Sequence, residues 1–162
     1  MTALSSRTAD GAASNWVFSD MVVDDLPEVI AIERASFSNP WTGPLFLQEL
    51  EVAFSRTILA RRAGESVAGY ACRWLVADEV HVLNVAVDPR HRGQGLGGTL
   101  MREVLREARQ RQATAVTLEV RRSNVAARRL YESFAFEEVG MRPNYYGRGE
   151  DALILRLALG DE

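Results

Sequence analysis

One stretch decides how the chain is organised: residues 83–98 read LNVAVDPRHRGQGLGG. An apolar strand pattern runs to Val87, Asp88 and Pro89 end it, and a loop rich in arginine and glycine follows. Over residues 97–111 the apolar positions then recur at helical spacing, with arginines and glutamates expected on the other side of the helix. The stretch predicts a strand, a loop and an amphipathic helix in succession.

The loop has the composition of a phosphate-binding site. Glycines that lead into a helix N-terminus let several backbone N–H groups converge on an anion, and the helix dipole adds partial positive charge. Arg90 and Arg92 can add side-chain charge. The lysine-containing P-loop motif is absent, and the glycines do not match the dinucleotide fingerprint. The sequence therefore does not favour an ATPase or a dinucleotide-binding protein.

Patterns on either side of the loop predict a mixed α/β domain. Strands are expected at residues 16–23, 56–62, 66–77, 79–87, 115–120, 136–141 and 152–159. Helices are expected from residues 24–28 onward, at 45–52, at 97–111 and after a cap at Ser123 and Asn124, with breaks at 38–44 and a turn at 63–66. The order βααβββαβαββ indicates an α/β fold built round one mixed sheet, covering residues 15–162. Residues 1–14 are predicted to form a disordered tail.

Length and composition set limits on the function. The chain has 162 residues, 47% of them hydrophobic and 25% charged, which is typical of one soluble domain. The single cysteine, Cys72, excludes an internal disulfide, and His81 and His91 lack ligand spacing, so we expect no metal. No apolar run reaches the roughly 20 residues of a membrane span. The N-terminus also lacks a secretory pattern. A cytoplasmic protein without a membrane partner is expected. Cys72, His81 and His91 are interpreted as structural residues.

The net charge of −3 is unevenly distributed. Residues 90–129 hold ten arginines and three glutamates, a balance of +7, whereas the rest of the chain sums to −10. A basic middle region favours one anionic ligand, and the acidic remainder favours a basic peptide as partner. No direct nucleic-acid partner is expected.

The loop and a later block resemble the GCN5-related N-acetyltransferases. Arg92, Gly95 and Gly97 form the pattern Arg-x-x-Gly-x-Gly after NVAVDP, which resembles the acetyl-CoA motif of that family. Residues 118–133 (LEVRRSNVAARRLYES) and 142–146 (RPNYY) are similar to its RimI-type subgroup, which acetylates the N-terminal alanine of a ribosomal protein. The family usually has glycine where this chain has Ala135, so the chain departs from the family pattern at the end of this helix. The resemblance covers about residues 16–159 and implies a splayed central sheet.

The resemblance implies acetyl-CoA as cosubstrate and assigns residues to it. Coenzyme A carries a pyrophosphate for the loop amides and a further phosphate for the arginines, and its pantetheine arm would pair with the strand before the loop. The implied cofactor contacts are Val85, Ala86, Val87, Arg92, Gly93, Gln94, Gly95, Leu96, Gly97, Gly98 and Asn124.

The resemblance also implies an acid and a base for direct transfer without an acyl-enzyme. Glu119 corresponds to the family's general base, and Tyr131 to the acid that protonates the departing thiolate. Without the resemblance, Glu119 would be read as a solvated strand residue and Tyr131 as a packing residue. Asn124 fits a helix cap and a cofactor contact equally.

The acceptor is expected to be the N-terminal peptide of a small-subunit ribosomal protein. Trp41, Asn144, Tyr145 and Tyr146 are the candidate acceptor-binding residues, although aromatics of this kind also anchor loops. A small-molecule amine acetyltransferase and a non-catalytic acyl-CoA-binding module remain the alternatives. The enzyme is expected to be a monomer or a weak dimer.

Overall fold

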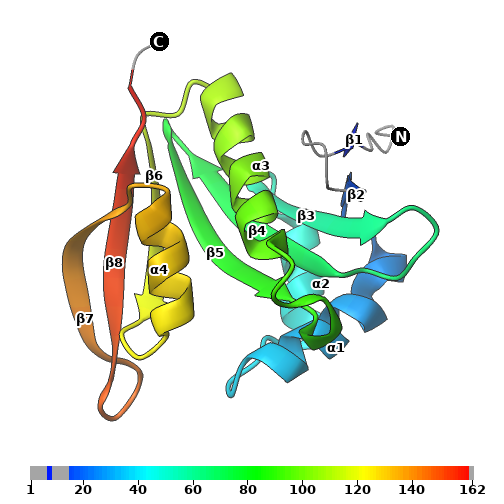
Figure 1. Cartoon of the computed structure of the whole chain (residues 1–162), viewed down its shortest axis with the longest axis horizontal. Coiled ribbons are helices and arrows are strands. Elements are labelled where there is room, and N and C mark those ends of the chain that lie inside the picture. The colour runs from blue at the N-terminus through cyan, green and yellow to red at the C-terminus, as the bar shows by residue number, and fades with distance from the viewer. Residues whose placement is uncertain (1–6, 9–14, 161–162) are drawn as a thin grey trace. The chain divides into compact units, whose positions relative to one another are not determined.

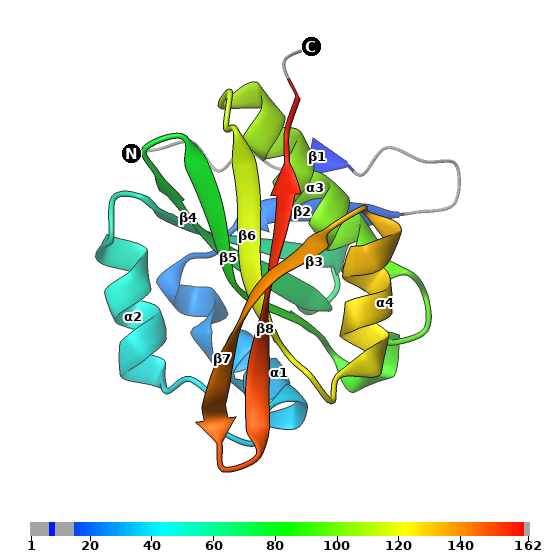
Figure 2. The same cartoon turned by 90° about the vertical axis from the view of Figure 1, so that its left-hand side faces the viewer.

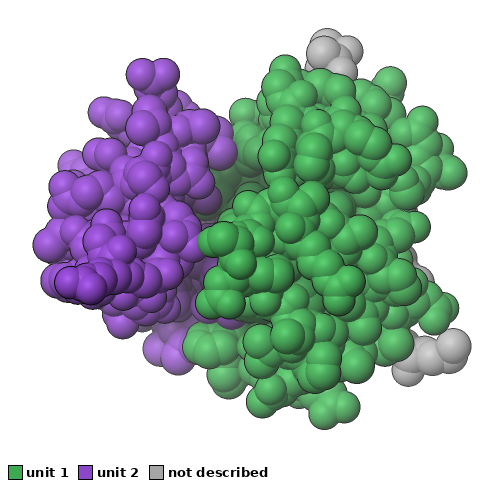
Figure 3. All heavy atoms as spheres, turned by 90° about the horizontal axis from the view of Figure 1, so that it is seen from below, with its two compact units in different colours: residues 1–74, 84–104 green, residues 75–83, 105–162 purple. Residues whose placement is uncertain are grey.

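The computed structural model describes residues 7–8 and 15–160. The chain divides into two compact units, which are coloured separately in Figure 3. Unit 1 comprises residues 1–74 and 84–104, and unit 2 comprises residues 75–83 and 105–162. Strand β5 (Glu79–Val87) and helix α3 (Leu96–Gln110) each contribute residues to both units.

Unit 1 is an antiparallel sheet with two helices packed on it. Its strands are β1 (Arg7–Thr8), β2 (Trp16–Asp20), β3 (Ser55–Arg62) and β4 (Gly69–Val76), each paired with the next (Figure 1). Helices α1 (Leu26–Ser36) and α2 (Gly43–Glu51) cover this sheet through a shared apolar core. That core consists of Met21, Val29, Ile32, Phe46, Leu59, Val67, Tyr70 and Ala86.

Local signals explain where these elements begin. A one-turn 3-10 helix, η1 (Val23–Asp25), leads into α1, so the first strand is shorter than the predicted 16–23. Helix α2 begins earlier than residue 45 because the Thr42 side chain accepts a hydrogen bond from the Leu45 amide and Pro44 sits in the first turn. Pro44, expected in the break between the two helices, instead lies in the first turn of the second.

Unit 2 is built on a mixed sheet. The N-terminal part of β5 pairs in parallel with β6 (Ala115–Arg121), β6 pairs antiparallel with β8 (Glu150–Ala158), and β8 pairs antiparallel with β7 (Glu137–Gly147). Helix α4 (Val125–Ser133) connects β6 to the β7–β8 hairpin (Figure 2). The parallel register runs from Glu79–Val82 against residues 115–118 and ends before either strand does. Pairing that ends early is the splay expected for this α/β fold.

The element order is the expected βααβββαβαββ preceded by one short strand, and some details differ as well. Strand β1 lies in the expected tail, whose residues 1–6 and 9–14 fall outside the described part of the chain. Strand β7 is longer than predicted because it continues through residues 142–147, with register shifts on the way. The apolar stripe of α3 is buried as expected, but Glu103 and Glu107 are buried as well. Both glutamates have interaction partners, which is what permits a charged side chain to be buried.

Helix α4 ends in the conformation that glycine usually supplies. Ala135 adopts φ +70°, with its amide bonded to Glu132 and the Phe136 amide bonded to Tyr131. These are the two bonds of a Schellman cap, and the ring of Phe136 packs edge-on to Tyr131 at 5.8 Å, the apolar contact typical of that motif. An alanine in this region costs about 1 kcal/mol. The departure at Ala135 therefore strains the exit but keeps its geometry.

Candidate active site

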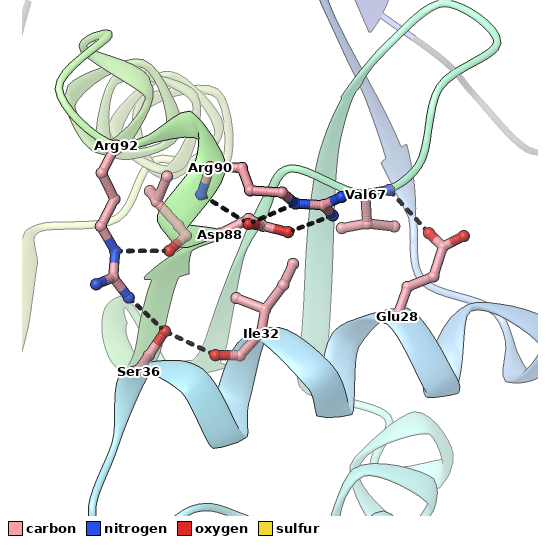
Figure 4. Close-up of polar contacts among 8 residues, drawn as sticks. Glu28, Ile32, Ser36, Val67, Asp88, Arg90 and Arg92 are labelled. Atoms are coloured by element: carbon pink, nitrogen blue, oxygen red, sulfur yellow. Dashed lines mark hydrogen bonds and ion pairs between the residues drawn. The ribbon is translucent and has the colours of Figure 1, made fainter.

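The turn after β5 is held by Asp88. Its carboxylate accepts a hydrogen bond from the Arg90 amide at 2.9 Å (Figure 4). This bond caps the short helix η2 (Pro89–His91). The same carboxylate pairs with the Arg90 guanidinium at 3.1 and 2.8 Å. Hydrogen bonding to Arg90 lowers the pKa of Asp88, so the carboxylate stays ionised. The charge of Arg90 is therefore compensated within the turn.

Arg92 ties the loop to the end of α1. Its Nε donates to the Val87 carbonyl and its Nη2 to Ser36 Oγ, both at 3.0 Å (Figure 4). The Ser36 hydroxyl donates in turn to the Ile32 carbonyl. These bonds give Arg92 a structural task within unit 1 in addition to any contact with a phosphate.

The loop glycines leave the backbone accessible. Gly93 and Gly95 have φ values of +76° and +79°, and a Cβ added at either would meet nothing within 4 Å. The Gly95 carbonyl accepts from the Thr99 amide, which begins α3 there. The first N–H groups of a helix have no intrahelical partner, so the amides of residues 96–98 are available to an anion. The loop thus has the backbone form of a phosphate cradle.

The other expected cofactor residues in unit 1 differ in their burial. Ala86 is buried in the core, whereas Val85 and Val87 are partly exposed. The Gln94 side chain accepts from Arg62 Nη2 at 3.0 Å, which links the loop to β3.

Trp41 is anchored in unit 1. Its amide donates to Glu33 Oε1 at 2.9 Å, and its ring packs against Phe46 at 5.3 Å. Glu33 is buried and also accepts from Tyr70 Oη and from Asn84 Nδ2. The loop-anchoring role weighed for Trp41 is therefore present, and its role in acceptor binding stays a prediction.

Glu119 is the central charged group of unit 2. It lies on β6 opposite Ile154 of β8, and its side chain is only 15% exposed. His81 Nε2 is 2.7 Å from Glu119 Oε2, and Arg142 Nη2 is 3.8 Å from Oε1. Hydrogen bonding to His81 lowers the pKa of Glu119 against the opposing effect of burial, with further lowering by the charges of His81 and Arg142. A partly buried carboxylate is thus kept ionised.

The sequence alone favours a structural role for His81, but its side chain lies against the candidate base Glu119. The contact follows from the strand register: His81 pairs with Thr117, and Glu119 lies two residues further on the same face of β6. Once β5 and β6 are taken as parallel neighbours, the diagonal contact between His81 and Glu119 follows.

His91 and Cys72 fit their structural interpretation. The ring of His91 packs edge-on to Trp16 at 5.8 Å. Cys72 is fully buried, and burial raises the pKa of its thiol, which disfavours the nucleophilic thiolate.

Tyr131 is buried on α4 with its ring against Phe136. Burial, with a smaller contribution from Tyr146, raises the pKa of Tyr131 to about 12. The hydroxyl therefore keeps its proton at every working pH. Asn124 caps the same helix, because its Oδ1 accepts from the Ala127 amide at 3.1 Å. The expected cap is confirmed, while the cofactor contact of Asn124 stays a prediction.

The segment with the paired tyrosines lies at the end of the β7–β8 hairpin. Asn144 has φ +54°, its amide donates to Asp151, and its side-chain oxygen accepts from Gly149. The Tyr146 ring lies under Arg121, 4.4 Å from its guanidinium carbon, and meets Tyr145 edge-on at 5.0 Å. Burial, followed by the charge of Glu119, raises the pKa of Tyr146 to about 12. Tyr145 itself is 52% exposed.

The described residues, 7–8 and 15–160, contain no group of three or more His, Cys, Asp or Glu side chains placed to hold a metal ion. None of their helices is long and apolar enough to cross a membrane.

Comparison with known proteins places the chain in a family. A relative from Escherichia coli, named as a ribosomal protein bS18-alanine N-acetyltransferase, is 36% identical over 145 residues, covering 87% of this chain and 96% of the relative. A Bacillus subtilis protein that bears the same name provisionally is 38% identical over 144 residues, 88% of this chain and 95% of its own. The crystal structure of the Escherichia coli enzyme superposes with a TM-score of 0.83 at 34% identity, over 91% of this chain and 96% of that one. The model of the acetyltransferase (GNAT) family matches residues 26–136, and the chain is a member of that family of acyltransferases.

Proposed function

We propose that this protein transfers the acetyl group of acetyl-CoA to the N-terminal α-amino group of a protein, with Glu119 as base and Tyr131 as acid. One observation carries the proposal: unit 2 brings a carboxylate and a phenol into one electrostatic neighbourhood. The charge of Glu119 acts on Tyr146, and Tyr146 acts in turn on the buried Tyr131. At neutral pH a carboxylate can take up a proton and a phenol can donate one.

The reaction needs both groups because two protons move. The amine must lose a proton before or during attack on the thioester carbonyl, since an ammonium group has no lone pair. Glu119 takes that proton, directly or through water, as the new C–N bond forms. The C–S bond then breaks, and the Tyr131 hydroxyl transfers its proton to the leaving thiolate. The products are the acetylated amine and coenzyme A.

Unit 1 supplies the cofactor site in this proposal. The amides of residues 93–98 bind the pyrophosphate of acetyl-CoA, and Val85, Ala86 and Val87 offer backbone groups to the pantetheine amides. Arg92 orders the loop through Val87 and Ser36. Asn124 is a further cofactor contact in the proposal, as the family resemblance implies. The cap uses only its Oδ1, so its side-chain nitrogen can donate to the cofactor.

The acceptor in the proposal is a ribosomal protein that begins with alanine, and the enzyme works in the cytoplasm, where such proteins are made. Support comes from the names of the relatives in Escherichia coli and Bacillus subtilis. An α-amine has a pKa near 8, about two units below lysine, so a weak carboxylate base suffices for it. Trp41, Asn144, Tyr145 and Tyr146 are proposed to contact the peptide.

The proposed specificity predicts a ranking of acceptors. With acetyl-CoA, a peptide that begins with alanine and continues with basic residues should turn over at least about tenfold faster than spermidine, because the peptide binds through several residues. Steady-state release of coenzyme A measures both reactions. A faster reaction with the polyamine would instead establish the small-amine alternative, and no turnover with any amine would favour the binding module.

Tyr131→Phe should reduce kcat by about 10²- to 10⁴-fold, as expected when one general acid is removed. The phenyl ring still packs on Phe136, so the helix and the affinity for coenzyme A should be unchanged. Steady-state kinetics with the alanine peptide separate the two effects, because a hydroxyl that acts on the leaving thiolate changes kcat and leaves ground-state binding alone. A kcat within a few-fold of wild type would reduce Tyr131 to a packing residue.

A further inference from the structure

His81 makes the shortest contact to the candidate base. Its Nε2 lies 2.7 Å from Glu119 Oε2, and the side chains are 35% and 15% exposed. A charge-assisted hydrogen bond in a partly buried place is stronger and better defined in geometry than an ion pair in water. Arg142, by contrast, is 55% exposed and 3.8 Å from the other oxygen, so solvent weakens its contribution.

The two carboxylate oxygens of Glu119 therefore have different surroundings. Oε2 accepts the hydrogen of His81, while the contact of Oε1 with Arg142 is longer than a hydrogen bond. The charged and titratable groups that face Glu119 are His81 from β5 and Arg142 and Tyr146 from β7, and its partner on β8 is the apolar Ile154. Because His81 occupies Oε2, we assign proton uptake from the amine, directly or through a water, to Oε1.

We propose that His81 is a positioning residue for the reaction: its Nε2–H fixes Glu119 Oε2, so that the carboxylate presents Oε1 for proton uptake. The inference rests on the proposed function, because it assigns His81 a task only if Glu119 is the base. It adds a residue from a second strand to the catalytic machinery. The imidazole itself neither contacts the substrate nor carries the transferred proton in this account.

Two substitutions separate the hydrogen bond from the ring. His81→Gln places an amide N–H₂ close to the position of Nε2, whereas His81→Asn places it close to Nδ1, too far back to reach Glu119. His81→Asn should lower kcat by about ten- to a hundredfold through misplacement of the base. His81→Gln should recover most of that loss, and the affinity for coenzyme A should be unchanged in both. Arg156→Gln is the matched control. It removes the ion pair, at 3.3 Å, between Arg156 of β8 and Glu79, which lies on β5 like His81, and it should retain wild-type kcat.

A second readout needs no substrate. A ¹³C NMR titration of the Glu119 carboxyl should show its pKa rising in His81→Asn, because burial then acts with less opposition, and staying low in His81→Gln. Wild-type kcat and an unshifted titration in His81→Asn would overturn the proposal. Equal loss of kcat in both variants would overturn it too, since the ring and not the hydrogen bond would then matter. An inactive wild-type enzyme would contradict the proposed function instead, and the titration would still test the His81–Glu119 bond.

Discussion

Gly95→Asp is expected to abolish coenzyme A binding in a protein that remains folded. Aspartate tolerates the φ of +79° better than most residues, and its Cβ would enter open space. The added carboxylate, however, would lie beside the amides that we assign to the pyrophosphate. Like charges placed together cost several kcal/mol, so the Kd should rise by at least about a hundredfold. Isothermal calorimetry with coenzyme A measures the change.

Two controls isolate the charge. Gly95→Asn has nearly the same size and backbone tolerance without the charge, so it should lose less affinity than the aspartate variant. Gly64→Asp adds the same charge at a turn with φ +77° and open space around its Cβ, and it should bind as wild type. Unchanged affinity in folded Gly95→Asp would remove the loop from the cofactor site.

Glu119→Gln is expected to bind acetyl-CoA normally and to lose about 10²- to 10⁴-fold in kcat at pH 7, the usual effect of removing a general base. The amide keeps the size of the side chain and an oxygen for His81, but it cannot take up a proton. Steady-state kinetics with the alanine peptide from pH 6 to 9 measure the loss.

The pH dependence gives the sign of the effect. The pKa of Glu119 is lowered, so the wild-type carboxylate is ionised throughout pH 6 to 9 and any fall in rate below pH 8 reports protonation of the amine. About a tenth of an amine with a pKa near 8 is neutral at pH 7, so raising the pH rescues the variant by at most about tenfold. If Glu119 only recognised the ammonium charge, the defect would appear in the acceptor KM and shrink at high pH, where the amine loses that charge. Wild-type kcat and KM at every pH would refute both roles.

The sequence predicted the fold well where the signals are local. Asn124 is the cap it was expected to be, β5 has the predicted bounds, and the stripe of α3 is buried. Such features depend on capping and on periodicity within a few residues. The early start of α2 was missed because Pro44 was read as a breaker, although proline is equally suited to a first turn.

Features that depend on tertiary contacts could not be read in this way. The side-chain contact between His81 and Glu119 depends on the parallel register of β5 and β6, which no local pattern reveals. The burial of Glu103 and Glu107 likewise depends on partners elsewhere in the chain. Arg92 was expected to serve a phosphate, but its bonds to Val87 and Ser36 appear only once the chain is folded.

The position of the acetyl group on a peptide with two kinds of amine shows whether the enzyme acts on α-amines. A peptide with N-terminal alanine and an internal lysine offers both kinds of amine in one molecule, and fragmentation mass spectrometry after incubation with enzyme and acetyl-CoA locates the added group. We expect acetylation of the alanine α-amine, which depends on Glu119 and leaves the lysine unmodified. Acetyl groups on the lysine side chain, with the α-amine free, would contradict it.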